Sequence, residues 1–432
     1  MILSLYRGLT TAASPAARAY LARRAIAGKE DPARLTERYG QASATRPDGK
    51  LVWIHAASVG ESLSMLSLIH RLAEDWPGLN LMMTTGTVTS ARILATRLPE
   101  HVIHQFVPLD RGRWVRRFLD HWRPDVALWV ESEFWPNLLC EIGARGIPSV
   151  LVNARISPKS FDGWRKWPSV IGRLLENFEL CLAQTEDDAR KLEGLGARRV
   201  VCRGNLKFSS GPLPVDEPEL QDMRQTIGHR PAWLAVSTHP GEEDIIADAH
   251  RRIRATRGHA LAIIVPRHPA RGPSIADKLR AEGSVVRLRS EREPLTDDTE
   301  FYIADSMGEL GLFYRLADAA FIGGSLIAHG GQNPLEAARL DCAIVHGPDM
   351  TNFTAIVDEL NGADAIIEAT NSEAIANAVG RLIDDPTERD RRIAAARDVA
   401  ATKAGILDDV VGELTPFIRP LMNGATGTDA GA

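Results

Sequence analysis

Short apolar runs alternate with longer segments of helical periodicity along the first half of this chain. The helical stretches include Glu61–Trp76 and Ser90–Leu98. Buried strands that alternate with helices form parallel sheets covered on both faces, so the pattern predicts a doubly wound α/β domain. The strand-like runs are Leu51–Ala57, Asn80–Thr84, His104–Val107, Val126–Val130, Ser149–Asn153, Leu180–Ala183 and Val200–Arg203.

A second series of the same kind follows an interruption at 209–219, where three prolines stand among acidic residues. This composition predicts a linker. We therefore expect two Rossmann-like domains, 41–208 and 220–421, facing each other across a cleft, and a disordered tail over 422–432. The second series of strand-like runs is Trp233–Ser237, Ala260–Val265, Ser284–Leu288, Phe301–Ala304, Ala319–Ile322 and Ala343–Val345.

The N-terminal segment, 1–40, differs from both domains. Residues 1–29 hold five basic side chains and no acid, together with leucine, isoleucine and tyrosine. Such a basic amphipathic segment is typical of chains that lie on an anionic membrane surface. The alternative is a frayed leader without a role. No run in the chain reaches the roughly 18 apolar residues of a membrane-spanning helix.

Composition narrows the classes of function. The 432 residues carry a net charge of -5, which argues against a nucleic-acid partner. The four cysteines are scattered, which fits free thiols better than disulfides or a zinc site. The chain has no P-loop, no G-x-G-x-x-G after a strand and no D-x-D. We expect no metal and no other cofactor.

The most informative segment runs from Ala317 to Glu336. A short apolar run is broken by Gly323-Gly324-Ser325, and His329-Gly330-Gly331 forms a second flexible turn. Asn333 then stands in a helix-capping position, with Glu336 in the first turn. The N–H groups at a helix start can hold a phosphate, and the Glu336 carboxylate could accept hydrogen bonds from a ribose. The alternative is an ordinary helix cap.

Carboxylates follow two strands of the first domain. Glu61 stands at a helix start after the first strand, where it could accept a proton from a hydroxyl group. Ser58 and Glu61 also form the pattern of a capping box, an equally good explanation from local sequence alone. Glu131 and Glu133 end another strand beside aromatic residues, and we consider Glu133 the stronger candidate of the two for a supporting or acceptor-side role.

Further polar residues end other strands. In the first domain, Arg155 could pair with an anionic substrate group, and Lys207 lies just before the linker. In the second, Ser237 and Thr238 begin a helix, and Arg267 offers a permanent positive charge for a nucleotide. Surface ion pairs or core packing would explain each of them equally well if it stood alone. The remaining candidates are Thr85, His268, Met307, Gly308 and Glu309.

The motifs together resemble one family. His-Gly-Gly-x-Asn-Pro-x-Glu at 329–336 resembles the nucleotide site of GT-B glycosyltransferases. Ser-Val-Gly-Glu at 58–61, Glu-x-Glu-x-Trp-Pro-Asn at 131–137, Gly-Asn-x-Lys at 204–207 and Ser-Met-Gly-Glu-Leu at 306–310 are similar to motifs of the 3-deoxy-D-manno-octulosonic acid (Kdo) transferases. The resemblance extends from about Tyr39 to Leu407.

The resemblance implies a GT-B enzyme that moves Kdo from CMP-Kdo to the glucosamine disaccharide of a tetraacylated lipid A precursor, with inversion. It implies that Glu61 is the general base and that Glu133 and Lys207 assist. It also implies a location at the cytoplasmic face of the bacterial inner membrane. Implied acceptor contacts are Ser58, Gly60, Thr85 and Arg155. Implied donor contacts are Ser237, Thr238, Arg267, His268, Met307, Gly308, Glu309, Gly331, Asn333 and Glu336.

Two alternatives belong to other classes. One is a different GT-B enzyme, such as a UDP-sugar 2-epimerase or a UDP-sugar transferase. The other is a non-catalytic protein that binds a lipid or a nucleotide at a membrane.

Overall fold

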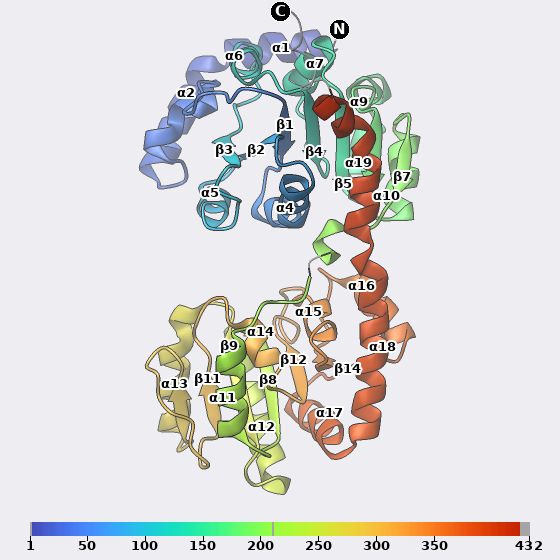
Figure 1. Cartoon of the computed structure of the whole chain (residues 1–432). Coiled ribbons are helices and arrows are strands. Elements are labelled where there is room, and N and C mark those ends of the chain that lie inside the picture. The colour runs from blue at the N-terminus through green and yellow to red at the C-terminus, as the bar shows by residue number, and fades with distance from the viewer. Residues whose placement is uncertain (1, 210, 424–432) are drawn as a thin grey trace, which may run out of the picture. The chain divides into compact units, whose positions relative to one another are not determined.

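The computed structural model describes residues 2–209 and 211–423, which form two compact units. The first unit comprises 1–210 together with 405–432, and the second comprises 211–404 (Figure 1). Each unit is built around one parallel sheet, so the predicted α/β fold with two doubly wound domains is confirmed.

The sheet of the N-terminal unit has the strand order β3-β2-β1-β4-β5-β6-β7, and every neighbouring pair is parallel. Strands β1 and β4 consist entirely of buried residues, as expected for a sheet covered on both faces. The strands are β1 (Leu51–His55), β2 (Asn80–Thr85), β3 (Ile103–Phe106), β4 (Val126–Val130), β5 (Ser149–Ala154), β6 (Leu180–Ala183) and β7 (Val200–Cys202).

Helices cover both faces of this sheet. One face packs on an aromatic core that includes Trp53, Phe118 and Trp129, and the other packs on an aliphatic core that includes Ile54 and Leu128. The helices are α1 (Ile2–Ala12), α2 (Ser14–Ile26), η1 (Pro32–Tyr39), α3 (Val59–Ser64), α4 (Leu66–Asp75), α5 (Val88–Leu94), α6 (Gly112–Trp122), α7 (Pro136–Ala144), α8 (Pro158–Trp164), α9 (Pro168–Leu175), α10 (Glu186–Gly194) and η2 (Leu206–Phe208).

The last helix, α19 (Ile406–Asn423), belongs to the N-terminal unit and not to the donor domain, where the sequence placed everything up to 421. Its apolar side chains, Val410 and Leu414 among them, are buried in the aliphatic core beneath β1 and β4. Ion pairs of 2.6 Å between Arg71 and Asp408 and 2.5 Å between Arg203 and Glu413 fix the same contact. The boundary expected at 421 therefore lies at 404.

The C-terminal unit has the strand order β10-β11-β9-β8-β12-β13-β14, again all parallel. The edge strand β14 has no counterpart among the predicted runs, since three residues are too few for a periodic signal. The strands are β8 (Ala232–Thr238), β9 (Leu261–Pro266), β10 (Val286–Leu288), β11 (Phe301–Ile303), β12 (Ala319–Ile322), β13 (Ala343–His346) and β14 (Ile366–Glu368).

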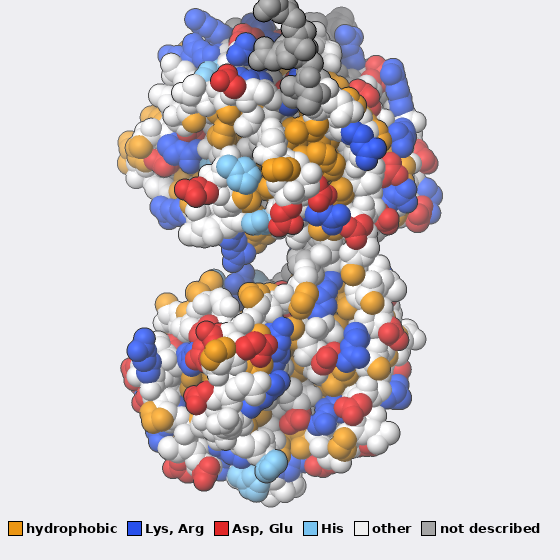
Figure 2. Space-filling model, viewed as in Figure 1, with side chains coloured by type: hydrophobic (Ala, Val, Ile, Leu, Met, Phe, Trp, Pro, Cys, Tyr) orange, Lys and Arg blue, Asp and Glu red, His pale blue; other side chains and the backbone are white. Residues whose placement is uncertain are grey.

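Helices also cover this second sheet, and Trp233, Phe301 and Phe321 lie in its core. Acidic and basic side chains are interspersed on the face of each unit shown in Figure 2, so that face carries no extended region of a single charge. The helices are α11 (Glu217–Ile227), α12 (Glu242–Thr256), η3 (Pro269–Arg271), α13 (Gly272–Ala281), α14 (Leu310–Tyr314), α15 (Leu335–Ala338), α16 (Thr354–Gly362), α17 (Ser372–Asp384) and α18 (Pro386–Ala404).

The strand order reverses between β1 and β4 in the first unit and between β8 and β12 in the second. In open α/β sheets, ligands bind beyond the carboxyl ends of the strands at such a reversal. The loops that follow these four strands carry most of the polar residues singled out from the sequence.

The N-terminal segment forms two helices on the first unit. In α1 the Tyr6 hydroxyl donates a hydrogen bond of 3.0 Å to Asp110, while Leu5 and Leu9 are about 60% exposed (63% and 60%). Among the described residues, no helix has the length and apolar character needed to cross a membrane. The predicted disorder of the tail concerns Met422 and Asn423, which are helical in α19, and residues 424–432, which lie outside the described residues.

Candidate active site

Glu61 lies in the first turn of α3, directly after β1. The Ser58 hydroxyl accepts a hydrogen bond of 3.3 Å from the Glu61 amide, and Glu61 Oε2 accepts one of 2.8 Å from the Ala57 amide. The predicted capping box is therefore present, and it fixes the Oε2 side of the carboxylate. Only 7% of the Glu61 surface is exposed, and burial raises the pKa of its carboxyl, although Ser58 and the Ala57 amide oppose the shift.

Glu131 and Glu133 follow β4 in a tight turn. Glu131 has a φ of 57°, a left-handed conformation that is uncommon for a residue with a long side chain. Glu133 is held by two tryptophans: its backbone oxygen accepts from Trp129 Nε1 at 2.5 Å, and its Oε2 accepts from Trp135 Nε1 at 2.8 Å. Strained backbone of this kind gathers at functional sites, which is a reason to include this turn in the site.

His55 supports this turn from behind and was not among the predicted site residues. Its ring centroid lies 4.5 Å from that of Trp129 and 5.5 Å from that of Trp135. Burial lowers the pKa of His55 to about 3, so the ring is neutral at physiological pH. His55 Nδ1 lies 3.0 Å from the Thr84 hydroxyl. The sequence signal was its position at the last residue of β1.

Glu61, Glu131 and Glu133 form one electrostatic cluster with two cations. Burial, followed by the charge of Glu61, raises the pKa of Glu131 from its ordinary value of 4.5 to about 7, while Arg155 and Lys207 oppose the shift. The charge of Glu133 also contributes to the raised pKa of Glu61. The most perturbed carboxyl with a stated value is thus that of Glu131, which the sequence ranked below Glu133.

Asn153 connects these residues to Lys207. It ends β5 with a φ of 54°, and its Oδ1 accepts a hydrogen bond of 2.9 Å from the Leu206 amide at the start of η2. Lys207, the next residue, is exposed. Arg155 is exposed as well, two residues beyond Asn153. The carboxyl ends of β1, β4 and β5 therefore bring the predicted cations to the predicted carboxylates.

Two other predicted acceptor residues differ in their placement. Gly60 is exposed, and a Cβ added there would meet nothing within 4 Å. Packing therefore does not require glycine at 60, although glycine costs a helix about 1 kcal/mol. Thr85 is fully buried, and its hydroxyl lies 3.0 Å from His104 Nε2. The structure thus directs Thr85 into the protein and gives its predicted acceptor role no geometric support.

In the C-terminal unit, a buried carboxylate organises the loops, and sequence analysis missed it. Glu242 is 0% exposed and lies in the first turn of α12. Its Oε2 accepts from the amides of His239 and Gly324 at 2.9 and 2.7 Å. Its Oε1 accepts from the amides of Ser325 and Leu326, each at 3.1 Å. The amides of the first glycine-rich turn are thus already occupied by Glu242.

The predicted serine and threonine of the donor site lie beside this carboxylate. Ser237 is half-buried with a φ of 54°, the same left-handed conformation that ends β4 and β5. Thr238 is buried, and its hydroxyl donates a hydrogen bond of 2.9 Å to Glu243. Ser237 is the better placed of the two to meet a ligand.

The helix expected to begin at Asn333 is shorter than predicted. Asn333 Oδ1 accepts a hydrogen bond of 3.1 Å from the Leu335 amide, but α15 contains only four residues. A helix this short has a weak macrodipole, so anion binding here would depend on individual N–H groups. Gly331 has a φ of 72°, and a Cβ there would lie 2.2 Å from Met350 Sδ, which explains the glycine. Glu336 is in the first turn of α15, as predicted.

Three histidines meet at the carboxyl ends of β8, β9 and β12. The ring centroids of His239 and His329 are 3.9 Å apart, and those of His239 and His268 are 6.4 Å apart. Burial and then the neighbouring His329 lower the pKa of His239. Arg267 and His268 are both exposed at the end of β9. The sequence pointed to His268 and Arg267, whereas His239 and His329 required the fold.

The loop after β11 exposes Met307 to solvent, with 72% of its surface accessible. This excludes the alternative that Met307 fills the core. Gly308 beside it has a φ of 87°. Glu309 is paired with Arg289 at 2.5 Å, and the guanidinium of Arg289 also binds Glu219. Glu309 therefore fixes the loop, which makes a direct donor contact for its carboxylate less favourable.

No group of three or more histidine, cysteine, aspartate or glutamate side chains is arranged to hold a metal ion within the described parts of the chain.

Comparisons with known proteins connect both half-sites to one family. Residues 33–210 match the family described as 3-Deoxy-D-manno-octulosonic-acid transferase (kdotransferase), and residues 280–399 match Glycosyl transferases group 1. A 3-deoxy-D-manno-octulosonic acid transferase of Rickettsia bellii is 36% identical over 85% of this chain and 87% of its own length. That of Haemophilus influenzae is 33% identical over 89% of this chain and 92% of its own.

Solved structures agree on the fold. A UDP-GlcNAc 2-epimerase from Neisseria meningitidis covers 85% of this chain and 100% of its own with a TM-score of 0.57 at 12% identity. A glycosyltransferase from Rickettsia africae gives a TM-score of 0.57 at 11% identity over 86% of this chain and 99% of its own. Identities this low show a shared GT-B architecture and nothing about the substrate. The family model and the curated relatives, by contrast, span the segments around Glu61 and Glu131, and the chain belongs to the Kdo transferase family of glycosyltransferases.

Proposed function

We propose that this Kdo transferase takes Kdo from CMP-Kdo and transfers it to a sugar hydroxyl of a tetraacylated lipid A precursor, with inversion at the anomeric carbon. The acceptor oxygen forms the new bond to that carbon, the bond to the CMP phosphate breaks, and CMP leaves. The proton of the acceptor hydroxyl passes to a protein carboxylate. Family membership supports the transfer of Kdo, and the residues below support the acceptor side and the mechanism.

The observation that carries the proposal is the oriented carboxylate of Glu61. Oε2 is fixed by the Ala57 amide, so Oε1 has a defined direction and can serve as a base. Burial raises its pKa towards the working pH, which favours proton transfer. The absence of a side chain at Gly60 leaves room for a bulky sugar next to Oε1.

The charges of the N-terminal half-site support an anionic donor sugar. Kdo carries a carboxylate, and the exposed cations Arg155 and Lys207 would attract it while Glu131 and Glu133 contact acceptor hydroxyls. Because one carboxyl of the cluster has a pKa of about 7, the cluster can accommodate an additional negative charge by retaining a proton on Glu131.

The C-terminal half-site would hold CMP. Arg267 would compensate the charge that develops on the leaving phosphate, and His268 would contact the same group. The exposed side chain of Met307 would pack on the nucleotide, and Glu336 would accept hydrogen bonds from the ribose. The proposal assigns no step to a metal ion, and unchanged turnover after chelation is the expected result.

We further propose that the protein works at the cytoplasmic face of the inner membrane and binds it peripherally. Leu5 and Leu9 lie on the same side of α1 and remain exposed, whereas Leu3 packs on the core. An exposed apolar stripe beside basic residues is suited to the boundary between headgroups and acyl chains.

The test is mass spectrometry of a tetraacylated lipid A precursor after incubation with CMP-Kdo and the purified protein. The wild type should add Kdo, and Glu61→Gln should reduce the rate by about 100- to 10,000-fold. The side-chain oxygen of the glutamine variant can still accept the hydrogen bond from the Ala57 amide, so the loop should keep its structure. Glu74→Gln, which removes an exposed carboxylate from the adjacent helix α4, is the matched control and should leave the rate unchanged.

An equal rate for Glu61→Gln would reduce Glu61 to a helix cap and sink the proposed mechanism. A wild type that binds CMP-Kdo without modifying this lipid would refute the proposed acceptor.

A further inference from the structure

A pocket of about 700 Å³ lies between α1, α7 and α9 of the N-terminal unit. None of the residues assigned above to the candidate active site lines it. Its volume falls in the range of pockets that hold small molecules. The function proposed above leaves this pocket without a role.

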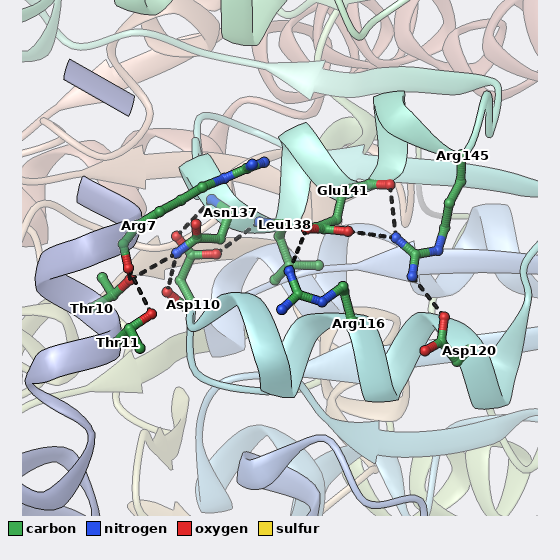
Figure 3. Close-up of polar contacts among 10 residues, drawn as sticks. All are labelled: Arg7, Thr10, Thr11, Asp110, Arg116, Asp120, Asn137, Leu138, Glu141 and Arg145. Carbon is green, nitrogen blue, oxygen red and sulfur yellow. Dashed lines mark hydrogen bonds and ion pairs between the residues drawn. The ribbon is translucent and has the colours of Figure 1, made fainter. Parts of the chain in front are cut away.

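The polar lining of the pocket is basic and contains no carboxylate. Arg7 of α1 and Arg173 of α9 supply two guanidiniums, and Ser4 and Ser169 supply two hydroxyls. Within the described parts of the chain, neither arginine forms an ion pair with a carboxylate. Figure 3 shows the Arg7 side chain passing Asn137 without an ion pair to Asp110.

Nearby arginines are neutralised, which makes this pair unusual. Arg116 of α6 and Arg145 after α7 bind the two oxygens of Glu141 at 3.1 and 2.7 Å, and Arg145 also binds Asp120 at 2.6 Å (Figure 3). Arg7 and Arg173 come from segments more than 160 residues apart and line one cavity without such a counter-charge. A multivalent anion would supply it.

Both arginines act on the same point of the pocket wall. The Cys140 thiol of α7 lines the pocket, and the charges of Arg7 and Arg173 both lower its pKa, although burial has the larger effect and raises it. The two guanidiniums therefore converge on the space in front of Cys140.

We propose that this pocket binds the phosphate of an anionic phospholipid headgroup, with Arg7 and Arg173 as its ligands. Guanidinium groups pair with phosphate oxygens in a bidentate manner. The pocket is also lined by Ile2, which is 39% exposed and precedes the exposed Leu5 and Leu9 on the same helix. These residues provide an apolar path for acyl chains directly beside the phosphate position.

Cys140 provides a direct test that does not depend on Kdo transfer. The full-length protein would be treated with iodoacetamide, with or without short-chain phosphatidylglycerol, sn-glycerol 3-phosphate or inorganic phosphate, and alkylation would be followed by mass spectrometry. We expect phosphatidylglycerol to slow the alkylation of Cys140 several-fold. Cys202, a partly buried thiol of β7 outside the pocket, is the internal control and should react at an unchanged rate.

Arg7→Gln and Arg173→Gln should each raise the concentration for half-protection about fivefold, as expected for the loss of one cation near a phosphate. Arg97→Gln, an exposed arginine without a carboxylate partner among the described residues, is the matched control and should protect like the wild type. Because each substitution at the pocket also changes the thiol pKa, the rates are compared as ratios with and without ligand. Unchanged melting temperatures would show that the variants are folded.

Protection by phosphatidylglycerol alone supports a lipid headgroup as the occupant. Equal protection by inorganic phosphate supports the same arginine pair as the site of a free anion and overturns the lipid assignment. A Cys140 rate that no probe changes, or equal protection in the double variant, would overturn the site itself. A failure of Kdo transfer would leave each of these results intact.

Discussion

Three residues at the carboxyl ends of strands adopt left-handed backbone conformations without being glycine: Glu131, Asn153 and Ser237. Such conformations cost about 1–3 kcal/mol and persist where the surrounding structure enforces them. Each begins a loop of a half-site, and Asn153 also anchors the segment that carries Lys207. The strain is thus concentrated where the chain must turn side chains towards a ligand.

The raised pKa of Glu61 leads to a prediction for the pH dependence of the reaction. A general base must be deprotonated, so kcat/KM should rise with pH through the raised pKa and level off above it. Glu133→Gln removes a negative charge that favours protonation of Glu61, and should move this inflection to lower pH. The amide oxygen of that variant can still accept the Trp135 indole hydrogen bond, so the turn should be retained.

The measurement is kcat/KM for CMP-Kdo as a function of pH in the wild type and in Glu133→Gln, with Glu74→Gln as the control for charge. Identical inflections in all three proteins would show that the titrating group is not coupled to Glu133.

Residue types at strand ends could be predicted from the sequence, because the chemistry of a capping box or a paired acid is local. The Ser58–Glu61 box appeared in the structure as expected. The function of Glu242 could not be predicted, since three of its four partners, Gly324, Ser325 and Leu326, lie over eighty positions away. From local sequence it is one of several acids in a first helical turn.

At the scale of elements, Glu242 joins the start of α12 to the turn after β12. Replacing it by glutamine should destabilise the C-terminal unit by about 2–4 kcal/mol, because the amide nitrogen cannot accept a hydrogen bond and leaves two buried N–H groups unpaired. The measurement is urea unfolding. The control is Asp244→Asn in the same helix turn, which breaks only an exposed pair with Lys278 and should change the stability by less than about 1 kcal/mol.

An equal effect of the two substitutions would mean that the glycine-rich turn is held in place without the carboxylate.

The last helix provides a second prediction at this scale. Leu414 of α19 is 0% exposed in the aliphatic core of the N-terminal unit. Leu414→Ala should cost about 2–5 kcal/mol of that unit's stability. Arg419→Ala, on the exposed side of the same helix, should cost little. If hydrogen exchange showed that the loss falls on β8–β14 and not on β1–β7, the assignment of α19 would be wrong.

Elements with long apolar runs were predictable for a physical reason: β1, β4 and β12 are buried on both faces and consist almost entirely of apolar residues. The misses are elements defined by their neighbours. Strand β14 exists because β13 offers it an edge, and α15 ends after one turn despite a good cap. The placement of α19 depends on which core its apolar face covers, and periodicity alone does not specify that.

At the scale of the whole molecule, family membership and the exposed side of α1 lead to a prediction about membrane binding. The double variant Leu5→Ser, Leu9→Ser should bind anionic vesicles about tenfold or more weakly, since each leucine loses its apolar contact with the lipid. Its melting temperature should change little because neither side chain is buried. Co-sedimentation with vesicles measures the effect, and Ala401→Ser on α18 is the control.

Vesicle binding that survives this double substitution would assign membrane attachment to another surface.

The path of the chain has a consequence for biosynthesis. Residues 1–209 contain the entire first sheet, yet the helix that closes its aliphatic side is encoded by the last part of the gene, after all of 211–404. A ribosome synthesises the N-terminal end first, so the unit that begins to form earliest is completed last. During translation, Ile54, Leu128 and their neighbours await a cover that is released only with the end of the chain. A premature stop codon anywhere before α19 would therefore damage the acceptor half of the enzyme, although every residue of that half-site had already been made.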